Sequence, residues 1–345
     1  MRCTNRIALG LSILTFCFAI AGCGNTASEG TTSTVSNPKS TGKGYSMPFD
    51  ADMNVSSYNI NSELHDSTLA ESFAMDLCVI DGNITDSLDE SADLSDATSA
   101  ALFNVNNKEA VFAQNVYGKV YPASLTKVMT ALVALKYGTT DQILTASSNV
   151  KITESGAQLA GIKEGDQMTL DQALHILLMY SANDAAIMIA EGVGGSVDGF
   201  SQMMNNEAKA LGATNTNFVN ANGLSDDEHY TTAYDLYLIF NEAIKYDLFN
   251  EIISQPTYTT VYTDKDGKEK NITVNSTNGF LSGSYPAPES VNVIGGKTGT
   301  TAAAGHCLVL LSRNPSGNPY ISIIMSSDST ENLYKDMTSL LEAIK

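Results

Sequence analysis

The sequence predicts an α+β fold, an α/β sandwich whose antiparallel sheet comes from N- and C-terminal segments and is flanked by helices, with a mostly helical subdomain. Three observations predict it. Strand-like segments begin near residue 100, helical periodicity dominates the middle of the chain, and strand-like segments return after residue 290. With 345 residues, of which 43% are hydrophobic and 17% charged, the chain can bury a large core.

The first strands form a predicted hairpin. Residues 100–105 and 110–113 are largely apolar, and the turn-forming residues 106–108 separate them. A buried helix is expected at 125–138, because apolar residues recur there at spacings of three and four. Gly138 provides a C-terminal stop for this helix.

The rest of the domain alternates predicted helices with stretches expected to be loops. Further helices are predicted at 169–180, 182–192, 197–211 and 231–246. The C-terminal region then has strands at 291–297, 307–312 and 320–325, a turn at 314–319 and a final helix at 331–344. Strands at both ends with helices between them indicate one sheet assembled from distant segments.

Composition excludes several function classes. The formal charge is −19, from 19 Lys and Arg against 38 Asp and Glu, which disfavours binding to nucleic acid backbones and polybasic binding to anionic membranes. The five Cys and four His show no CxxC or HxxxH spacing, which argues against a structural zinc site. No metal or cofactor is expected.

The N-terminus has the pattern of an export signal. Arg2 and Arg6 precede the short apolar stretch 7–20, which is too short for a spanning helix. The small residues before Cys23 resemble a bacterial lipobox, so residues 1–22 are expected to be removed and Cys23 to be lipidated. The alternative is a plain secretory signal in which Cys23 is incidental.

Three segments follow the predicted cleavage site. Residues 23–68 are rich in Ser, Thr, Gly and Asn and indicate a flexible tether. Residues 69–97 form an acidic N-terminal segment of uncertain role, and the compact domain is expected at residues 98–345. Export permits a disulfide between Cys78 and Cys307, but two buried free thiols fit the sequence equally well.

The first chemical motif is Ser124-Leu125-Thr126-Lys127 at the start of a predicted helix. Lys127 lies on the same helix face as Ser124, within reach of its hydroxyl. A serine hydroxyl becomes a good nucleophile when a base takes its proton, and a lysine can do so where burial or nearby positive charge lowers its pKa. The alternative is Ser124 as a helix cap with an exposed Lys127.

The second motif, Ser181-Ala182-Asn183, lies between two predicted helices. Ser181 is positioned to relay a proton, and Asn183 to hydrogen-bond substrate or hold Lys127. The alternative is a polar helix boundary in which Ser181 or Asn183 acts as a cap.

The third motif lies within Gly295-Gly296-Lys297-Thr298-Gly299-Thr300. It is not a phosphate-binding loop, because residue 291 is Val where that pattern needs Gly. Gly299 allows a substrate backbone to approach the strand closely. Lys297 and Thr298 offer a cation and a hydroxyl to a carboxylate.

The ordered set SxxK, SxN and KTG resembles that of the penicillin-interacting serine enzymes. The flanking segments are most similar to the low-molecular-mass D-alanyl-D-alanine carboxypeptidases, and the resemblance covers residues 98–345. The segments that carry it are 121–130, 218–224, 229–233 and 295–308. The resemblance implies a β-lactamase/transpeptidase-like fold without metal or cofactor.

The same resemblance implies roles for the motif residues. Ser124 is the acylated nucleophile and Lys127 the general base, while Ser181 and Asn183 complete the hydrogen-bond network. The substrate's terminal carboxylate is held by Lys297, Thr298 and Thr300, and Gly299 completes the substrate-binding residues of the third motif. The backbone N–H groups of Ser124 and Thr300 form the oxyanion hole.

The expected activity is removal of the terminal D-Ala from peptidoglycan stem peptides through an acyl-enzyme, with β-lactams as covalent inhibitors. The expected location is outside the cytoplasm, on a membrane through the N-terminal lipid and facing the cell wall. The chain departs from longer family members, because no C-terminal β-domain is expected after the last helix. Two alternatives stay open: a serine β-lactamase on the same scaffold, and a non-catalytic lipoprotein that binds penicillin or cell wall.

Overall fold

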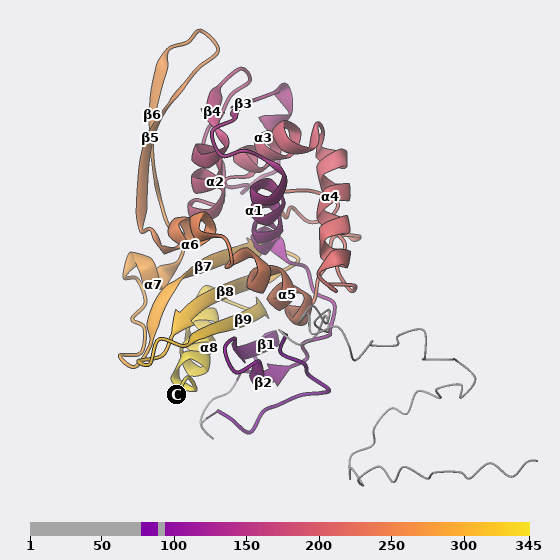
Figure 1. Ribbon diagram of the computed structural model, residues 1–345, viewed down its shortest axis with the longest axis vertical. Helices are drawn as coiled ribbons and strands as arrows, with labels where there is room; N and C mark the ends of the chain where they lie inside the picture. Colours follow the sequence, from indigo (N-terminus) through magenta and orange to yellow (C-terminus); the bar gives the residue numbers. More distant parts are fainter. Residues whose placement is uncertain (1–76, 89–93) are drawn as a thin grey trace, which may run out of the picture. The chain divides into compact units, whose positions relative to one another are not determined.

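The central element of the fold is a five-stranded antiparallel sheet with the strand order β2-β1-β9-β8-β7 (Figure 1). The computed structural model describes residues 77–88 and 94–345, so the predicted signal, Cys23 and the tether lie outside the described residues. The strands of this sheet are β1 Ala97–Asn104, β2 Glu109–Gln114, β7 Asn292–Thr301, β8 Gly305–Arg313 and β9 Pro319–Ser327. The prediction of one sheet from both ends of the domain is confirmed.

The two faces of this sheet are buried in separate apolar clusters. Along β8, Leu308 and Leu310 belong to one cluster while Val309 and Leu311 belong to the other, because successive side chains of a strand point to opposite faces. Helix α8 Thr330–Glu342 covers the first face. Burial on both faces explains why β8 and β9 are continuous apolar runs rather than alternating ones.

The second face of the sheet meets the helices. These are α1 Thr126–Tyr137, α2 Leu170–Met179, α3 Asn183–Gly194, α4 Val197–Ala210, α5 Ala233–Ala243 and α6 Asp247–Ser254. The short α7 Gly279–Ser282 packs with α8 instead, through Phe280 and Tyr334. The ring of Phe103 in β1 stacks on Tyr237 of α5, with centroids 4.0 Å apart. Helix α1 is buried over its first nine residues and forms the centre of the helical region. The predicted helices are confirmed, with shifts of one to three residues at their ends.

A second sheet occupies segments that were predicted to be loops. It has the order β3-β4-β5-β6, with β3 Ile143–Thr145, β4 Gln167–Thr169, β5 Thr257–Thr263 and β6 Glu269–Asn275. Strands β3 and β4 are too short to show a period. Strands β5 and β6 form a long hairpin beside the helices (Figure 1). Most of their side chains are polar, and the apolar alternation is short, as with Ile272 and Val274 in β6.

Part of the segment before β1 packs on helix α5. The Cys78 N–H donates to the Tyr237 hydroxyl at 2.9 Å, and the Tyr234 hydroxyl donates to the Cys78 carbonyl at 2.8 Å. Cys78 and Cys307 are both buried and free, so the free-thiol alternative describes the structure.

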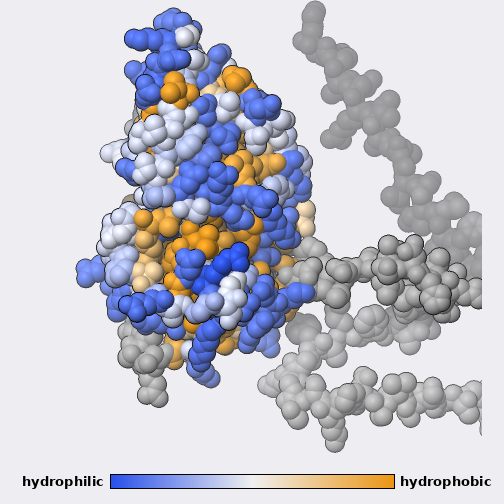
Figure 2. All heavy atoms as spheres, turned by 60° about the vertical axis from the view of Figure 1, so that its left-hand side comes forward, coloured by the Kyte–Doolittle hydropathy of each residue, from blue (hydrophilic) through white to orange (hydrophobic). Residues whose placement is uncertain are grey.

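The surface seen in Figure 2 is hydrophilic over most of its area, with an apolar region around its middle height. Within the described ranges, no helix has both the length and the apolar content needed to cross a membrane.

Candidate active site

The three sequence motifs meet at one cleft, of about 890 Å³, between the edge strand β7 and the helical region. Ser124 comes from the turn before α1, Ser181 and Asn183 from the junction of α2 and α3, and the third motif from β7. The cleft is lined by five of the predicted site residues in addition to Gly299: Ser124, Ser181, Asn183, Thr298 and Thr300. The structure thus brings together segments separated by more than 100 positions in the chain.

The nucleophile candidate lies on a strained turn. Ser124 is the middle residue of the 3₁₀ turn Ala123–Leu125, and Ala123 has a φ of +48°, a left-handed conformation that alanine rarely adopts. Gly223, with a φ of +83°, packs so closely on this turn that a Cβ there would lie 1.9 Å from the Ala123 carbonyl oxygen. Strain of this kind persists only where packing holds it, and it clusters at functional sites.

Gly299 lines the cleft and also packs on the turn that carries Ser124. A Cβ at this position would lie 3.1 Å from the backbone nitrogens of Ser124 and Leu125. The missing side chain therefore allows β7 to pack directly against the turn that carries Ser124. The close approach of a substrate backbone at Gly299 stays a prediction.

Lys127 lies beside the Ser124 hydroxyl. Its Nζ is 2.8 Å from Ser124 Oγ, 2.7 Å from Asn183 Oδ1 and 2.5 Å from the Asn222 carbonyl oxygen. A neutral lysine has two hydrogens and one lone pair. When those hydrogens are donated to the oxygens of Asn183 and Asn222, the lone pair is left to accept the proton of the Ser124 hydroxyl.

Burial favours this neutral form. Lys127 is completely buried, and loss of hydration lowers its pKa well below the usual range. The positive charge of Lys297 lowers the pKa of Lys127 further, while the Asp184 carboxylate opposes the shift. A lowered pKa favours the neutral amine, which can accept a proton, and this environment fits the base role that the sequence motif predicts.

Lys297 is also completely buried and does not itself line the cleft. Its Nζ donates to Ser181 Oγ at 2.9 Å and to the Thr298 carbonyl at 2.7 Å. Burial lowers its pKa to about 7. Ser181 has a φ of +63° and is, after Ala123, a second residue of the site with a strained left-handed backbone. Its hydroxyl lies between the cleft and Lys297.

Two threonine hydroxyls of β7 line the cleft in front of Lys297. Thr298 Oγ1 is 2.6 Å from Thr277 Oγ1, and Thr300 Oγ1 is 3.4 Å from His306 Nδ1. Hydroxyls backed by a buried cation form a suitable site for a carboxylate.

Sequence reasoning missed the carbonyl of Asn222 and the hydroxyl of Thr277. The segment 218–224 carried a family resemblance but no assigned role, because a backbone carbonyl leaves no mark in a sequence. Nearby His229 is buried rather than part of the cleft. Its Nδ1 accepts from the Val219 N–H at 3.1 Å, so Nε2 carries the proton and donates to Thr126 Oγ1 at 2.7 Å. Burial lowers the pKa of His229 to about 4 and keeps it neutral.

Comparison with known proteins agrees with this geometry. The profile of the family described as D-alanyl-D-alanine carboxypeptidase matches residues 87–329. The chain is 29% identical over 254 residues to the D-alanyl-D-alanine carboxypeptidase DacF of Bacillus subtilis (strain 168), covering 72% of this chain and 61% of that protein. It is 34% identical over 224 residues to DacA of Escherichia coli (strain K12), covering 62% and 52%. The chain therefore spans between half and two thirds of the length of these relatives.

Solved structures show the same fold. The crystal structure of the Streptomyces K15 DD-transpeptidase superposes with a TM-score of 0.66 and 28% sequence identity, covering 72% of this chain and 96% of that one. The antiparallel sheet with its helical region is thus the penicillin-binding DD-peptidase fold.

Proposed function

The chain belongs to the D-alanyl-D-alanine carboxypeptidase family, and on that premise we propose that it removes the terminal D-Ala from peptidoglycan stem peptides. One observation carries the proposal most directly. The Ser124 hydroxyl lines a cleft of about 890 Å³ and is 2.8 Å from the amine of a completely buried lysine, Lys127.

Acylation follows from the contacts around Ser124. Lys127 Nζ takes the hydroxyl proton as Ser124 Oγ attacks the carbonyl carbon of the penultimate D-Ala. The N–H groups of Ser124 and Thr300 bind the oxyanion of the tetrahedral intermediate. The peptide bond then breaks, and the amine of the departing D-Ala receives a proton through the Ser181 hydroxyl. Water later attacks the Ser124 ester, which releases the shortened peptide and restores the hydroxyl.

The terminal carboxylate of the substrate binds at β7. Thr298 and Thr300 present their hydroxyls to it, and Lys297 adds positive charge from behind Ser181. Asn183 lines the cleft and accepts a hydrogen bond from Lys127 Nζ, so it can contact the substrate while it holds Lys127. β-Lactams, which imitate this peptide end, acylate Ser124.

We further propose that residues 98–345 are the catalytic domain, and that the tether 23–68 links it to a lipid on Cys23 after removal of residues 1–22. The protein then acts outside the cytoplasm, on a membrane and facing the cell wall. Replacing Cys23 by Ala should move the protein from the membrane fraction to the soluble fraction. Unchanged fractionation would refute the lipid anchor and leave the catalytic proposal intact.

The catalytic proposal is tested by D-Ala release from a pentapeptide ending in D-Ala-D-Ala, with the wild type and with Ser124→Ala. We expect release by the wild type alone, and covalent labelling of the wild type alone by fluorescent penicillin. Labelling without D-Ala release would favour a non-catalytic penicillin-binding lipoprotein. Rapid hydrolysis of nitrocefin would favour a β-lactamase.

A second activity of the same acyl-enzyme is suggested by the name of the solved relative, a DD-transpeptidase. Transfer of the acyl group to an amine instead of water would join two peptides. Adding glycine to the pentapeptide assay as the acceptor measures this partition, because transpeptidation would produce a glycine-terminated peptide in place of the tetrapeptide.

A further inference from the structure

One wall of the cleft is an irregular segment that no motif predicted. Residues 154–158 line the cleft, and the chain continues through residues 159–162 before reaching β4. We call residues 154–162 the wall segment. Its backbone has no strand or helix to hold it, so other groups must satisfy its N–H donors.

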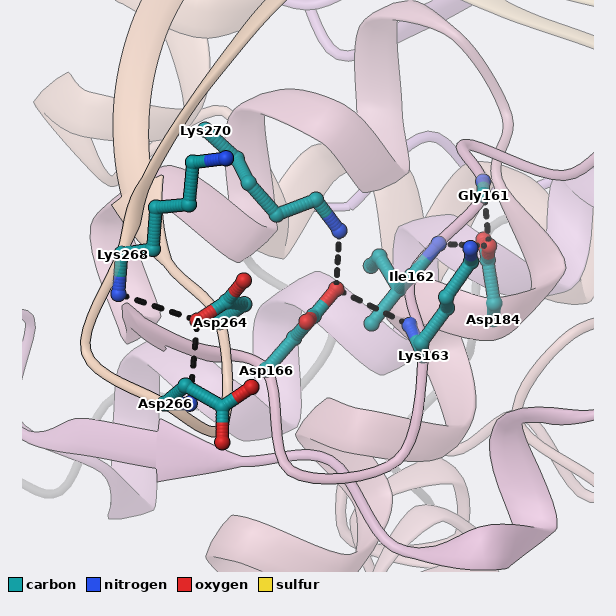
Figure 3. A network of polar contacts seen from close by, with 9 residues as sticks. All are labelled: Gly161, Ile162, Lys163, Asp166, Asp184, Asp264, Asp266, Lys268 and Lys270. Carbon is teal, nitrogen blue, oxygen red and sulfur yellow. Dashed lines mark hydrogen bonds and ion pairs between the residues drawn. The ribbon is translucent and has the colours of Figure 1, made fainter.

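The carboxylate of Asp184 satisfies three consecutive donors of the wall segment, two of which, Gly161 and Ile162, are seen in Figure 3. Asp184 Oδ1 accepts from the Ala160 N–H at 3.0 Å, and Oδ2 accepts from the N–H groups of Gly161 and Ile162 at 2.9 and 3.0 Å. Oδ1 also accepts from the Ala185 N–H at 3.0 Å, in the first turn of α3. Asp184 is 1% exposed, so these bonds hold the charge away from water.

The same turn of α3 reaches the catalytic lysine. Asn183, the preceding residue, donates its backbone N–H to the Gln158 carbonyl at 2.8 Å, while its Oδ1 accepts from Lys127. The two neighbours thus connect both ends of residues 158–162 to α3. A shift of Asp184 would move the wall segment and Asn183 together.

We propose that Asp184 is a positioning residue for acylation, which fixes the wall segment over the cleft and holds Asn183 against Lys127. The inference rests on the proposed function. It assigns a role to a side chain that touches neither the substrate nor Ser124.

The charge of Asp184 also affects the pKa of Lys127, so its removal should change the pH dependence of acylation, which a purely structural role would not do. The charged groups that shift the pKa of Lys127 are Lys297 of β7, which lowers it, and Asp184 of α3, which raises it. His229 is nearby and neutral, and its own pKa is lowered mainly by burial and also by the charge of Lys127. Removing the negative charge at 184 lowers the pKa of Lys127, because that carboxylate favours the protonated amine. Around Asp184 itself, a small cavity is also lined by Lys151, Lys163 and Glu164.

The chain offers a matched control in Asp166, which is 2% exposed and also holds backbone and side-chain donors. Asp166 Oδ2 accepts from the Lys163 N–H at 3.0 Å and from Lys270 Nζ of β6 at 2.7 Å (Figure 3). Its charge is not among those that shift the pKa of Lys127. Replacing Asp166 therefore measures how much stability is lost when a buried carboxylate is removed, without a change in the pKa of Lys127.

The experiment measures the rate of Ser124 acylation by fluorescent penicillin against pH, together with Tm, for the full-length protein. For Asp184→Asn we expect a maximal rate lower on the order of tenfold, since misplacement of catalytic groups has costs of that size or larger. We also expect the acid limb of the profile to move to lower pH. Asp166→Asn should lower Tm and keep the acid limb of the wild type.

A second variant changes the wall segment, which supplies the N–H donors, and leaves the carboxylate of Asp184 intact. Gly161 has a φ of +82°, and a Cβ at this position would have nothing within 4 Å, so Gly161→Ala strains the wall segment without a clash. We expect a lower maximal rate with an unmoved acid limb. This variant decides the proposal if Asp184→Asn does not fold.

An unchanged maximal rate in Gly161→Ala, or a folded Asp184→Asn with the rate and acid limb of the wild type, would overturn the inference. An inactive wild type would instead refute the proposed function, so the two failures are distinguishable.

Discussion

One completely buried lysine lies on each side of the cleft, Lys127 on the side of the helices (the helical wall) and Lys297 on the side of β7 (the sheet wall). The surroundings of the two lysines differ. On the helical wall, Lys127 contacts the nucleophile and two carbonyl-type oxygens, and two neighbouring charges shift its pKa in opposite directions. On the sheet wall, Lys297 contacts a hydroxyl and a backbone carbonyl, and burial alone lowers its pKa. The first arrangement suits proton transfer, and the second suits a charge that strengthens binding.

The largest expected effect tests the helical wall. Lys127→Ala should reduce the acylation rate by about 10²- to 10⁴-fold, the usual contribution of a general base. Stopped-flow acylation with fluorescent penicillin measures it. The exposed Lys245→Ala, which removes only a surface pair with Glu242, is the control and should keep the wild-type rate. A loss of less than tenfold in a folded Lys127→Ala would break the distinction between the two walls.

An intermediate effect is expected on the sheet wall. Lys297→Ala should raise KM for the pentapeptide by about 10- to 100-fold, since a charged hydrogen-bond network contributes about 1.5–3 kcal/mol, and change kcat less. In the wild type, Lys297 is protonated below its pKa of about 7 and neutral above it. Attraction for the carboxylate is therefore lost as pH rises through this pKa, and KM should rise over the same interval. Lys297→Ala should lack this rise, and a KM that is flat with pH in the wild type would contradict the assigned role.

The smallest expected effect tests the junction between the two walls, where β7 packs at Gly299 against the turn that carries Ser124. Gly299→Ala places a Cβ 3.1 Å from the Ser124 nitrogen and should slow acylation several-fold while destabilising the fold by about 1 kcal/mol. Gly267→Ala, at a left-handed position in the β5–β6 turn with open space around it, should cost a similar amount of stability through strain alone. Thermal unfolding and acylation rates separate the two. Equal acylation rates in both variants would show that the junction tolerates displacement.

Much of the fold followed from local patterns. Apolar spacing predicted α1, and the apolar runs of β8 and β9 predicted strands. The second sheet escaped prediction because β3 and β4 have three residues each and the β5–β6 hairpin is polar. Such strands form through pairing with distant partners, which no local window contains.

The sequence by itself determined which residues of the candidate site carry reactive groups, since Ser124, Lys127, Ser181, Asn183, Lys297 and the β7 hydroxyls were all identified from three short motifs. Only the tertiary structure decided how those groups behave. The basicity of Lys127 depends on burial and on Lys297, 170 positions away in the chain, and its third partner is a backbone carbonyl that any residue could provide. The same holds for Asp184, whose role depends on the N–H groups of the wall segment. Hydration, charge and hydrogen bonding act through space, so they become defined when the chain is folded.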